Sequence, residues 1–343
     1  MFTKLFSTER RCEVATGLVI VALFGFGLGG GELVLRVQQL QRFGKAVTVE
    51  RSENFVVDQA TGLLVPRAGA KFGRIQINSL GFRSPEITAQ KGPDTLRIAF
   101  LGSSTTFDPM VGNDDMWTHV ASTHLRRALS GCNVEFVNAG APGYGSQAIM
   151  KRLTEHVLPL DPDIVVVLAG DVANDANELA NAMGLTDRPN QRVSMLAKIS
   201  ILWAKIEKSI AVIRLQRAAH SDVGKLELEP NDLAEEFGER LTELVRTANQ
   251  TNRLVVLLTQ ASRVKRTQSK RAQTMASTWL YYMPYLSIPT YLELIDAYNG
   301  ALRIAAEKQR AVVVDAFESV PADFVHFADA THLTKLGDQI VGG

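Results

Sequence analysis

Three side chains in two distant segments could form an activated nucleophile. The apolar run 98–101 breaks at Gly102 into small hydroxyl residues, and this break delivers Ser104 to the end of a buried strand. Far along the chain lies Asp329-Ala-Thr-His332. A serine hydroxyl is a poor nucleophile at neutral pH, so it needs a base within hydrogen-bond reach and a third group that orients the base. We predict that Ser104 is the nucleophile, His332 the base and Asp329 its orienting partner.

Two further segments could stabilise a developing oxyanion, which this chemistry also requires. The strand-like run 134–138 opens into a glycine-rich stretch, where Gly140 lets a backbone N–H approach a ligand closely. The apolar run 164–168 leads to Asn174, whose side-chain amide could donate a second hydrogen bond. Both residues are therefore predicted donors.

These four blocks, in this order, resemble the SGNH (GDSL-type) hydrolase superfamily. The similarity rests on Leu-Gly-Ser-Ser104-Thr-Thr, Asn-Ala-Gly140, Ala-Asn174-Asp and Asp329-Ala-Thr-His332. Carried over residue by residue, the resemblance gives Ser104, His332 and Asp329 the same catalytic roles. It also implies an oxyanion hole made of the Ser104 backbone N–H, Gly140 and Asn174. The resemblance implies no metal or organic cofactor.

The resemblance extends over roughly residues 75–343 and is of the membrane-anchored bacterial type. Two residues within these blocks depart from the family pattern. Ser103 stands where the family name has an aspartate, and Val172 stands where the third block usually has a glycine. The second departure leaves Asn177 as a weaker alternative to Asn174.

Apolar runs and amphipathic stretches alternate along the chain and predict the elements that must position these residues. Runs that predict strands lie at 98–101, 134–138, 164–168, 254–258 and 312–315. The alternation indicates an α/β fold, and we expect a three-layer flavodoxin-like sandwich with a central, mostly parallel five-stranded sheet. Ligands bind outside the carboxyl ends of such strands, so the predicted site residues should converge on one sheet edge.

The N-terminal region predicts a membrane anchor. Residues 14–31 form an uncharged, apolar stretch of eighteen residues. At about 1.5 Å per residue, a helix of this length just crosses a hydrocarbon core of about 30 Å. A cleaved signal peptide is the alternative interpretation. We predict a cytoplasmic stub with a transmembrane helix over 1–36, a stalk with a small β decoration over 37–93, and a hydrolase domain over 94–343.

The side of the membrane on which the catalytic domain lies follows from the resemblance. Basic residues flank the apolar stretch on both sides, so their count does not settle its orientation. Long domains translocate largely regardless of charge. The resembling bacterial proteins place the catalytic domain outside the cytoplasm. We therefore expect a single-pass membrane protein with a periplasmic or extracellular catalytic domain.

Two segments do not belong to the simple alternation. The first is a helical insertion at about 188–232, in which apolar residues repeat at steps of three and four over 191–217. This stripe predicts a cap helix packed on the domain, with a coiled coil or a membrane-surface lid as alternatives. The second is the aromatic run 279–285, which could line a sugar or acyl pocket or pack in the core.

Composition excludes several other classes of protein. The 343 residues carry a net charge of +1 without a long basic stripe, which argues against nucleic-acid binding. Cys12 and Cys132 form neither a disulfide framework nor a metal-binding pattern, and the six histidines are scattered. His326 is the rival base, and we expect it to be a loop residue without an aspartate partner.

Together these observations predict a serine esterase that works through a Ser104 acyl-enzyme. The resembling bacterial enzymes often act on acetylated carbohydrates, so we expect the substrate to carry O-acetyl groups on an envelope or exported carbohydrate. A carbohydrate O-acetyltransferase with the same triad is one alternative. A non-catalytic carbohydrate-binding protein on this fold is the other.

Overall fold

The structure is a computed structural model that describes residues 8–43, 54–169, 172–182, 194–222, 225, 229–250 and 253–343. The chain divides into two compact units. One unit comprises Met1–Glu50 and Gln191–Ile210, and the other comprises Arg51–Asn190 and Ala211–Gly343. The second unit contains every predicted catalytic or oxyanion-binding residue.

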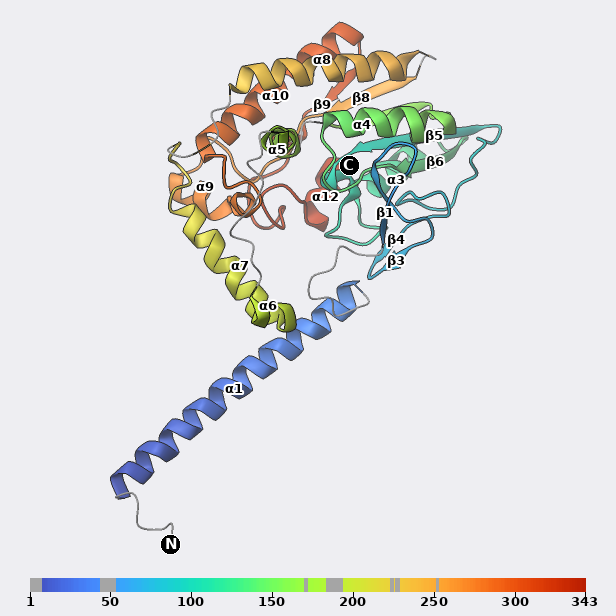
Figure 1. Ribbon diagram of the computed structural model, residues 1–343. Helices are drawn as coiled ribbons and strands as arrows, with labels where there is room; N and C mark the ends of the chain where they lie inside the picture. Colours follow the sequence, from blue (N-terminus) through green and yellow to red (C-terminus); the bar gives the residue numbers. More distant parts are fainter. Residues whose placement is uncertain are drawn as a thin grey trace. The chain divides into compact units, whose positions relative to one another are not determined.

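A five-stranded sheet forms the centre of the second unit (Figure 1). Its strands are β5 (Thr95–Gly102), β6 (Asn133–Asn138), β7 (Ile164–Leu168), β8 (Leu254–Leu258) and β9 (Val312–Val314). They lie in the order β6-β5-β7-β8-β9, and each pairing is parallel. The predicted α/β fold with a five-stranded parallel sheet is therefore confirmed. The chain places β6 on one side of β5 and then β7 on the other side. In such sheets, ligand crevices form at the point where the strand order switches in this way.

Helices cover both faces of the sheet (Figure 1). Along β5, Ile98 and Phe100 join one core cluster with Trp117, whereas Ala99 and Leu101 join the other. This double burial explains why the strands read as unbroken apolar runs. On one face lie α3 (Trp117–Ala128) and α12 (Lys335–Gly342), and on the other lie α4 (Ser146–Arg152), α5 (Val172–Ala182), α8 (Pro230–Asn249) and α10 (Ile288–Gln309).

Shorter elements complete the second unit. They are α2 (Ser104–Phe107), α9 (Lys270–Ala276), α11 (Ala316–Ser319), a π-helical turn η1 (Leu153–Val157), and the 3₁₀ turns η2 (Leu158–Leu160) and η3 (Thr278–Tyr281). Two antiparallel hairpins precede the sheet, β1 (Phe55–Val57) with β2 (Leu64–Pro66) and β3 (Lys71–Phe72) with β4 (Ile75–Gln76). Ile75 and Ile77 pack against Phe107 at the end of α2, so the second hairpin supports the helix that carries Ser104.

The first unit contains α1 (Thr8–Phe43), α6 (Met195–Ile199) and the first part of α7 (Ile201–Gln216). The Glu32 carboxylate accepts hydrogen bonds from the Ser200 hydroxyl at 2.9 Å and from the backbone N–H groups of Ile201 at 3.1 Å and Leu202 at 2.8 Å. It therefore caps the first turn of α7. Burial acts to raise the pKa of Glu32, but these hydrogen bonds outweigh burial and lower the pKa to about 2.

The predicted transmembrane anchor is not supported. Among the residues that the structure describes, no helix has the length and apolar character needed to cross a membrane. Most side chains of residues 11–24, which include much of the predicted span, lie outside the described part of the chain.

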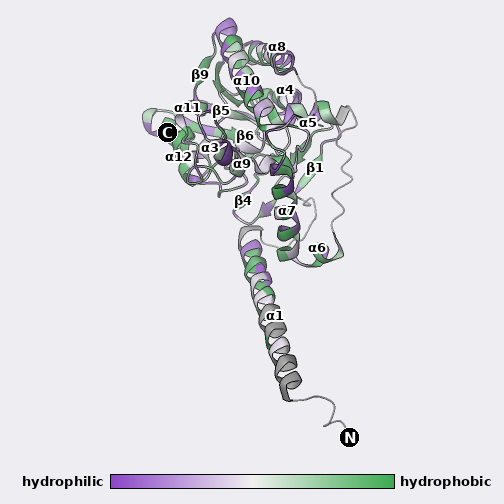
Figure 2. Cartoon of the chain, turned by 90° about the vertical axis from the view of Figure 1, so that its left-hand side faces the viewer, coloured by the Kyte–Doolittle hydropathy of each residue, from purple (hydrophilic) through white to green (hydrophobic). Residues whose placement is uncertain are grey.

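The predicted helical insertion contains α6 and α7, and residues on both sides of them lie outside the described part. Its apolar stripe lies on two helices, because Ser200 is extended and separates α6 from α7. Leu196 and Ile199 on α6 are 53 and 67% exposed, and Ile213 on α7 is 55% exposed. Figure 2 shows hydrophobic residues along α7.

A buried arginine fixes the beginning of β5. The Arg97 side chain has no exposed surface, and its guanidinium donates to Glu135 Oε2 at 2.8 and 3.1 Å. It also donates to three backbone carbonyls, including that of Leu160 at 2.6 Å. The Arg97 backbone N–H donates to Asp163 Oδ2 at 2.8 Å. Arg97 thus ties β5 to β6 and to the segment that leads into β7.

Replacement of Arg97 by alanine is expected to lower the free energy of unfolding by about 3–5 kcal/mol, because it leaves Glu135 and three carbonyls without their donor. Urea unfolding followed by circular dichroism measures the change. Arg246→Ala is the control, since Arg246 is 57% exposed and pairs with Glu243 on the surface. The control should cost less than about 1 kcal/mol. Equal losses in the two variants would contradict the structural role of Arg97.

Candidate active site

The end of β5 turns sharply to present Ser104. A Cβ atom at Gly102 would lie 2.9 Å from the carbonyl oxygen of Leu168 and still closer to Thr106, so only glycine fits there. Ser103 then caps α2, which begins with Ser104. Ser104 is partly exposed, while its neighbours on either side are buried. The turn therefore presents one hydroxyl group at the carboxyl edge of the sheet.

The structure brings Ser104, His332 and Asp329 together in a hydrogen-bonded chain. Ser104 Oγ lies 2.9 Å from His332 Nε2, and His332 Nδ1 lies 2.8 Å from Asp329 Oδ2. The other Asp329 oxygen accepts the backbone N–H groups of Thr331 at 3.0 Å and His332 at 2.9 Å. These distances allow the imidazole to take the serine proton while the carboxylate holds the opposite ring nitrogen.

Asp329 is held in its charged form. Partial burial acts to raise the pKa of its carboxyl group, but the His332 side chain and the backbone N–H groups of Thr331 and His332 outweigh that effect. The pKa of Asp329 is consequently below its ordinary value. A carboxylate that stays ionised near neutral pH can stabilise the imidazolium that forms when His332 accepts a proton.

The segment that carries His332 is a tight turn closed by main-chain bonds. Ala328 N–H donates to the His332 carbonyl at 2.8 Å, and Thr334 N–H donates to the His326 carbonyl at 2.9 Å. Thr334 then caps α12 by accepting the Gly337 N–H at 3.4 Å. The turn and the helix thus fix the direction from which the imidazole approaches Ser104.

Two of the three predicted oxyanion donors point at a single oxygen atom. Asn174 Nδ2 donates to Ser103 Oγ at 2.8 Å, and the Ser104 backbone N–H donates to the same oxygen. Asn174 Nδ2 also contacts the Tyr144 carbonyl at 3.0 Å. Because the two donors converge, they could both bind one substrate oxygen. The Ser103 hydroxyl occupies that point in this structure.

The third predicted donor is engaged elsewhere. Gly140 N–H donates to Asn138 Oδ1 at 3.0 Å. Asn138 Nδ2 donates in turn to the Thr106 carbonyl at 2.7 Å, so Asn138 joins Gly140 to α2. Sequence reasoning missed this residue, although it opens the Asn-Ala-Gly140 block. In this conformation Gly140 supports the nucleophile turn instead of pointing its N–H at the Ser103 oxygen.

The weaker candidates lie apart from this hydrogen-bonded chain. Asn177 Oδ1 accepts the Tyr285 hydroxyl at 3.1 Å. His326 Nδ1 contacts Asp323 Oδ1 at 2.8 Å, so the expectation that His326 lacks an aspartate partner is wrong. The spacing Asp-x-x-His therefore occurs twice, and the second copy is the one whose imidazole contacts Ser104.

The aromatic run 279–285 contributes largely to the core. Trp279 is buried and stacks on Tyr291 with ring centroids 4.4 Å apart, and Tyr285 is also buried. Tyr282 is 48% exposed. Of the two alternatives for this run, core packing therefore describes Trp279 and Tyr285.

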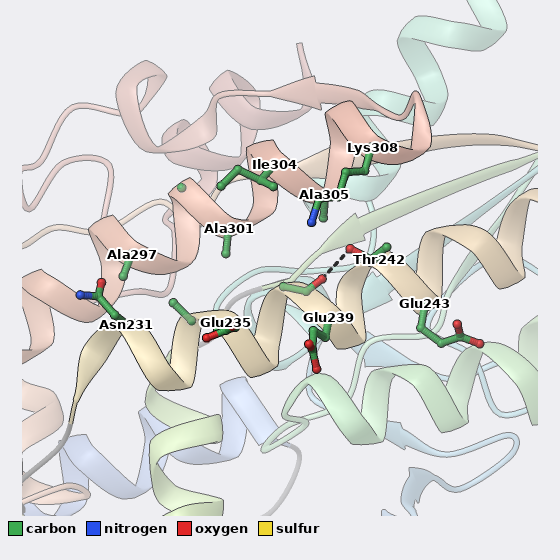
Figure 3. A pocket seen from close by; sticks show the side chains of 13 residues that line it. Asn231, Glu235, Glu239, Thr242, Glu243, Ala297, Ala301, Ile304, Ala305 and Lys308 are labelled. Atoms are coloured by element: carbon green, nitrogen blue, oxygen red, sulfur yellow. Dashed lines mark hydrogen bonds between the residues drawn. The ribbon is translucent and has the colours of Figure 1, made fainter.

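Two cavities differ in whether residues next to Ser104 and His332 line them. A groove of about 560 Å³ between α8 and α10 is lined by small residues and by glutamates such as Glu235 and Glu239 (Figure 3), and no predicted site residue lines it. A hollow of about 10 Å³ is lined by Thr105, Thr331 and Leu333, which flank Ser104 and His332. The groove between α8 and α10 therefore does not serve the Ser104 site.

Comparisons with known proteins were made for the whole chain. The model of the GDSL-like lipase/acylhydrolase family matches residues 100–340. A search of curated proteins found no match.

Several solved structures are similar to the chain. LAE5, an alpha/beta hydrolase enzyme from the metagenome of Lake Arreo, Spain, is 18% identical, with 73% of this chain and 92% of that chain covered and a TM-score of 0.44. The acetyl xylan esterase AlAXEase is 16% identical, with 72 and 96% covered and a TM-score of 0.44. A catalytic mutant of Axe2, an acetylxylan esterase from Geobacillus stearothermophilus, is 15% identical, with 72 and 90% covered and a TM-score of 0.45.

Replacement of Gly140 by alanine is expected to lower the free energy of unfolding by about 1–3 kcal/mol. The added Cβ atom would lie 2.6 Å from the Phe107 nitrogen and 2.9 Å from the Thr106 carbonyl carbon, which are backbone atoms of α2. Urea unfolding at neutral pH measures the loss. Gly131→Ala is the matched control, because no atom lies within 4 Å of its added Cβ. If the two variants are equally stable, the close packing of Gly140 on α2 is wrong.

Proposed function

The chain belongs to the GDSL-like lipase/acylhydrolase family, and we propose that its ester hydrolysis proceeds through Ser104, His332 and Asp329. The protein is a hydrolase that acts on ester bonds. The observation that carries the residue assignment is the chain of hydrogen bonds, 2.9 Å from Ser104 Oγ to His332 Nε2 and 2.8 Å from His332 Nδ1 to Asp329 Oδ2.

In the proposed acylation step, Ser104 Oγ attacks the ester carbonyl carbon while its proton moves to His332 Nε2. The carbonyl oxygen becomes an oxyanion, and the imidazolium is stabilised by the ionised Asp329. The tetrahedral intermediate then collapses, and His332 gives its proton to the leaving alcohol. A water molecule repeats the sequence on the acyl-enzyme, releasing the acid and restoring the Ser104 hydroxyl.

The Ser104 N–H and the Asn174 amide are the proposed oxyanion donors. Their support is that both donate to Ser103 Oγ, which marks a point that one substrate oxygen can occupy. The oxyanion would take the place of the Ser103 hydroxyl there, which requires this buried side chain to rotate away. Gly140 joins these donors if its N–H exchanges Asn138 for the substrate oxygen.

For the substrate we propose O-acetyl groups on an envelope or exported carbohydrate. The proposal rests on the resemblance in sequence.

Variants of the triad test this proposal directly. Ser104→Ala and His332→Ala should abolish labelling by a fluorophosphonate and nearly all hydrolysis of an aryl acetate. Asp329→Asn should lower kcat by up to about 10,000-fold, because the neutral amide no longer holds the imidazole in the required tautomer.

The second Asp-x-x-His set supplies the matched control. Asp323→Asn and His326→Ala should leave kcat within about twofold of the parent enzyme. Undiminished turnover in Ser104→Ala, or equal losses in the 323–326 and 329–332 variants, would contradict the assignment.

The acyl group and the acceptor are tested with the parent enzyme. Aryl acetate should be hydrolysed faster than the corresponding octanoate, and acetylated oligosaccharides should release acetate. Formation of an acylated sugar in place of free acetate, when a sugar acceptor is supplied, would show that the acyl group is transferred instead.

A further inference from the structure

Two buried carboxyl groups lie next to each other near the end of α2, the short helix that begins at Ser104. Asp108 is 2% exposed and Asp338 is fully buried at 0%. The two side chains are hydrogen-bond neighbours of one another. Asp108 ends α2, where its N–H donates to the Ser104 carbonyl at 2.7 Å, and Asp338 lies on α12, which follows the His332 turn. The pair therefore joins the two segments that carry the nucleophile and the base.

The oxygen atoms of this pair have few other partners. Among the described residues, the backbone N–H groups of Met110, toward Asp108, and Trp117, toward Asp338, are their other hydrogen-bond neighbours. Two ionised carboxylates in contact would repel each other in a site from which water is excluded. One shared proton removes the repulsion and supplies the hydrogen bond, as in other carboxyl pairs that bind a single proton.

A buried arginine balances the remaining negative charge. Arg83 has no exposed surface, and its guanidinium donates to the carbonyls of Phe107, Asp108 and Val111 and to Asn113 Oδ1. It thus holds the end of α2 and the loop that follows it. Its positive charge favours one ionised carboxyl group in the pair but does not compensate two.

We propose that Asp108 and Asp338 are positioning residues that hold the Ser104 turn against the His332 segment through one shared proton. This inference rests on the proposed roles of Ser104 and His332. The proton is held in a hydrogen bond between a carboxyl oxygen of Asp108 and one of Asp338, and neither carboxyl group touches the substrate.

The electrostatic surroundings agree with a single bound proton. Burial raises the pKa of both carboxyl groups, and the charge of Asp108 raises that of Asp338 further. The charge of Arg83 lowers the pKa of both carboxyl groups, and the charge of His332 lowers the pKa of Asp108. From α3, the Trp117 backbone N–H also lowers the pKa of Asp338.

One further ion pair lies on the same helix. Lys335 Nζ of α12 is 2.8 Å from Asp115 Oδ1, next to the beginning of α3. It is a contact of exposed groups, since the Lys335 side chain is 61% exposed. This ion pair joins α12 to the segment before α3 as a solvent-screened contact, whereas the proposed shared proton joins α12 to the buried end of α2.

The sign of the pH dependence follows from the raised pKa of Asp338. A carboxyl group whose pKa is higher in the folded protein than in the unfolded chain stabilises the fold below its unfolded pKa. That stability is lost as the pH rises through the folded value. Loss of the proton leaves two buried negative charges that push α2 and α12 apart.

Asp338→Asn tests the shared proton without relying on activity. The amide donates permanently to Asp108, so this variant should gain thermal stability relative to the parent protein as the pH rises from about 5 to about 9. Asp296→Asn is the control, because Asp296 is 49% exposed and pairs with Arg266 on the surface. The difference in melting temperature between this control and the parent should not change with pH. The proposal is overturned if the Asp338→Asn difference is equally flat.

Activity provides the second readout, with rates expressed per site that reacts with fluorophosphonate. The parent enzyme should lose about tenfold in kcat, reversibly, between about pH 8 and pH 10, whereas Asp338→Asn should lose less than about twofold. Asp338→Leu, which makes no hydrogen bond, should lower kcat about tenfold already at neutral pH with KM unchanged. A normal kcat per labelled site in Asp338→Leu would overturn the positioning role.

The outcomes separate this inference from the proposed triad. If the parent enzyme hydrolyses esters and Ser104→Ala does so equally well, the triad assignment fails, while the pH-dependent stability of Asp338→Asn can still be observed. If Ser104 is labelled normally and the two pH profiles coincide, the positioning role fails and the triad stands.

Discussion

The common edge at which β5 and β7 end is the constraint on which the candidate site depends. These neighbouring strands are parallel and in register, with Gly102 opposite Leu168. The segments that follow them therefore leave the sheet at the same level, and the Ser104 N–H and the Asn174 amide reach one oxygen of Ser103. A slip of one residue would turn every side chain of a strand to the other face and separate these donors.

Local patterns in the sequence were sufficient to predict the sheet and the residues that meet at its edge. Unbroken apolar runs mark strands that are buried on both faces, and small residues mark the points where those strands end. Spacing alone does not distinguish His332 from His326 as the candidate base, because Asp323 and His326 repeat the offset of Asp329 and His332. Only the folded chain distinguishes the two pairs, since the choice depends on which imidazole reaches Ser104.

The polar groups inside the protein were much harder to predict. An isolated arginine or aspartate in a sequence is predicted to lie on the surface, because burying a charge is costly without a partner. Arg83 and Asp338 are buried because their partners come from distant parts of the chain, and no local pattern reveals such partners. The apolar stripe of residues 196–213 shows another limit: its spacing predicted one helix, whereas the chain forms α6 and α7 with an extended Ser200 between them.

The contact between Ser104 and His332 joins residues 228 positions apart. Contacts of such long separation form late in folding, since the intervening chain must lose much of its freedom before they are stable. A partly folded chain with an intact sheet would already have most of the native secondary structure, yet Ser104 would lack its contact with His332, the proposed base. Recovery of enzymatic turnover during refolding would therefore time the docking of the C-terminal segment, a step to which circular dichroism is nearly blind.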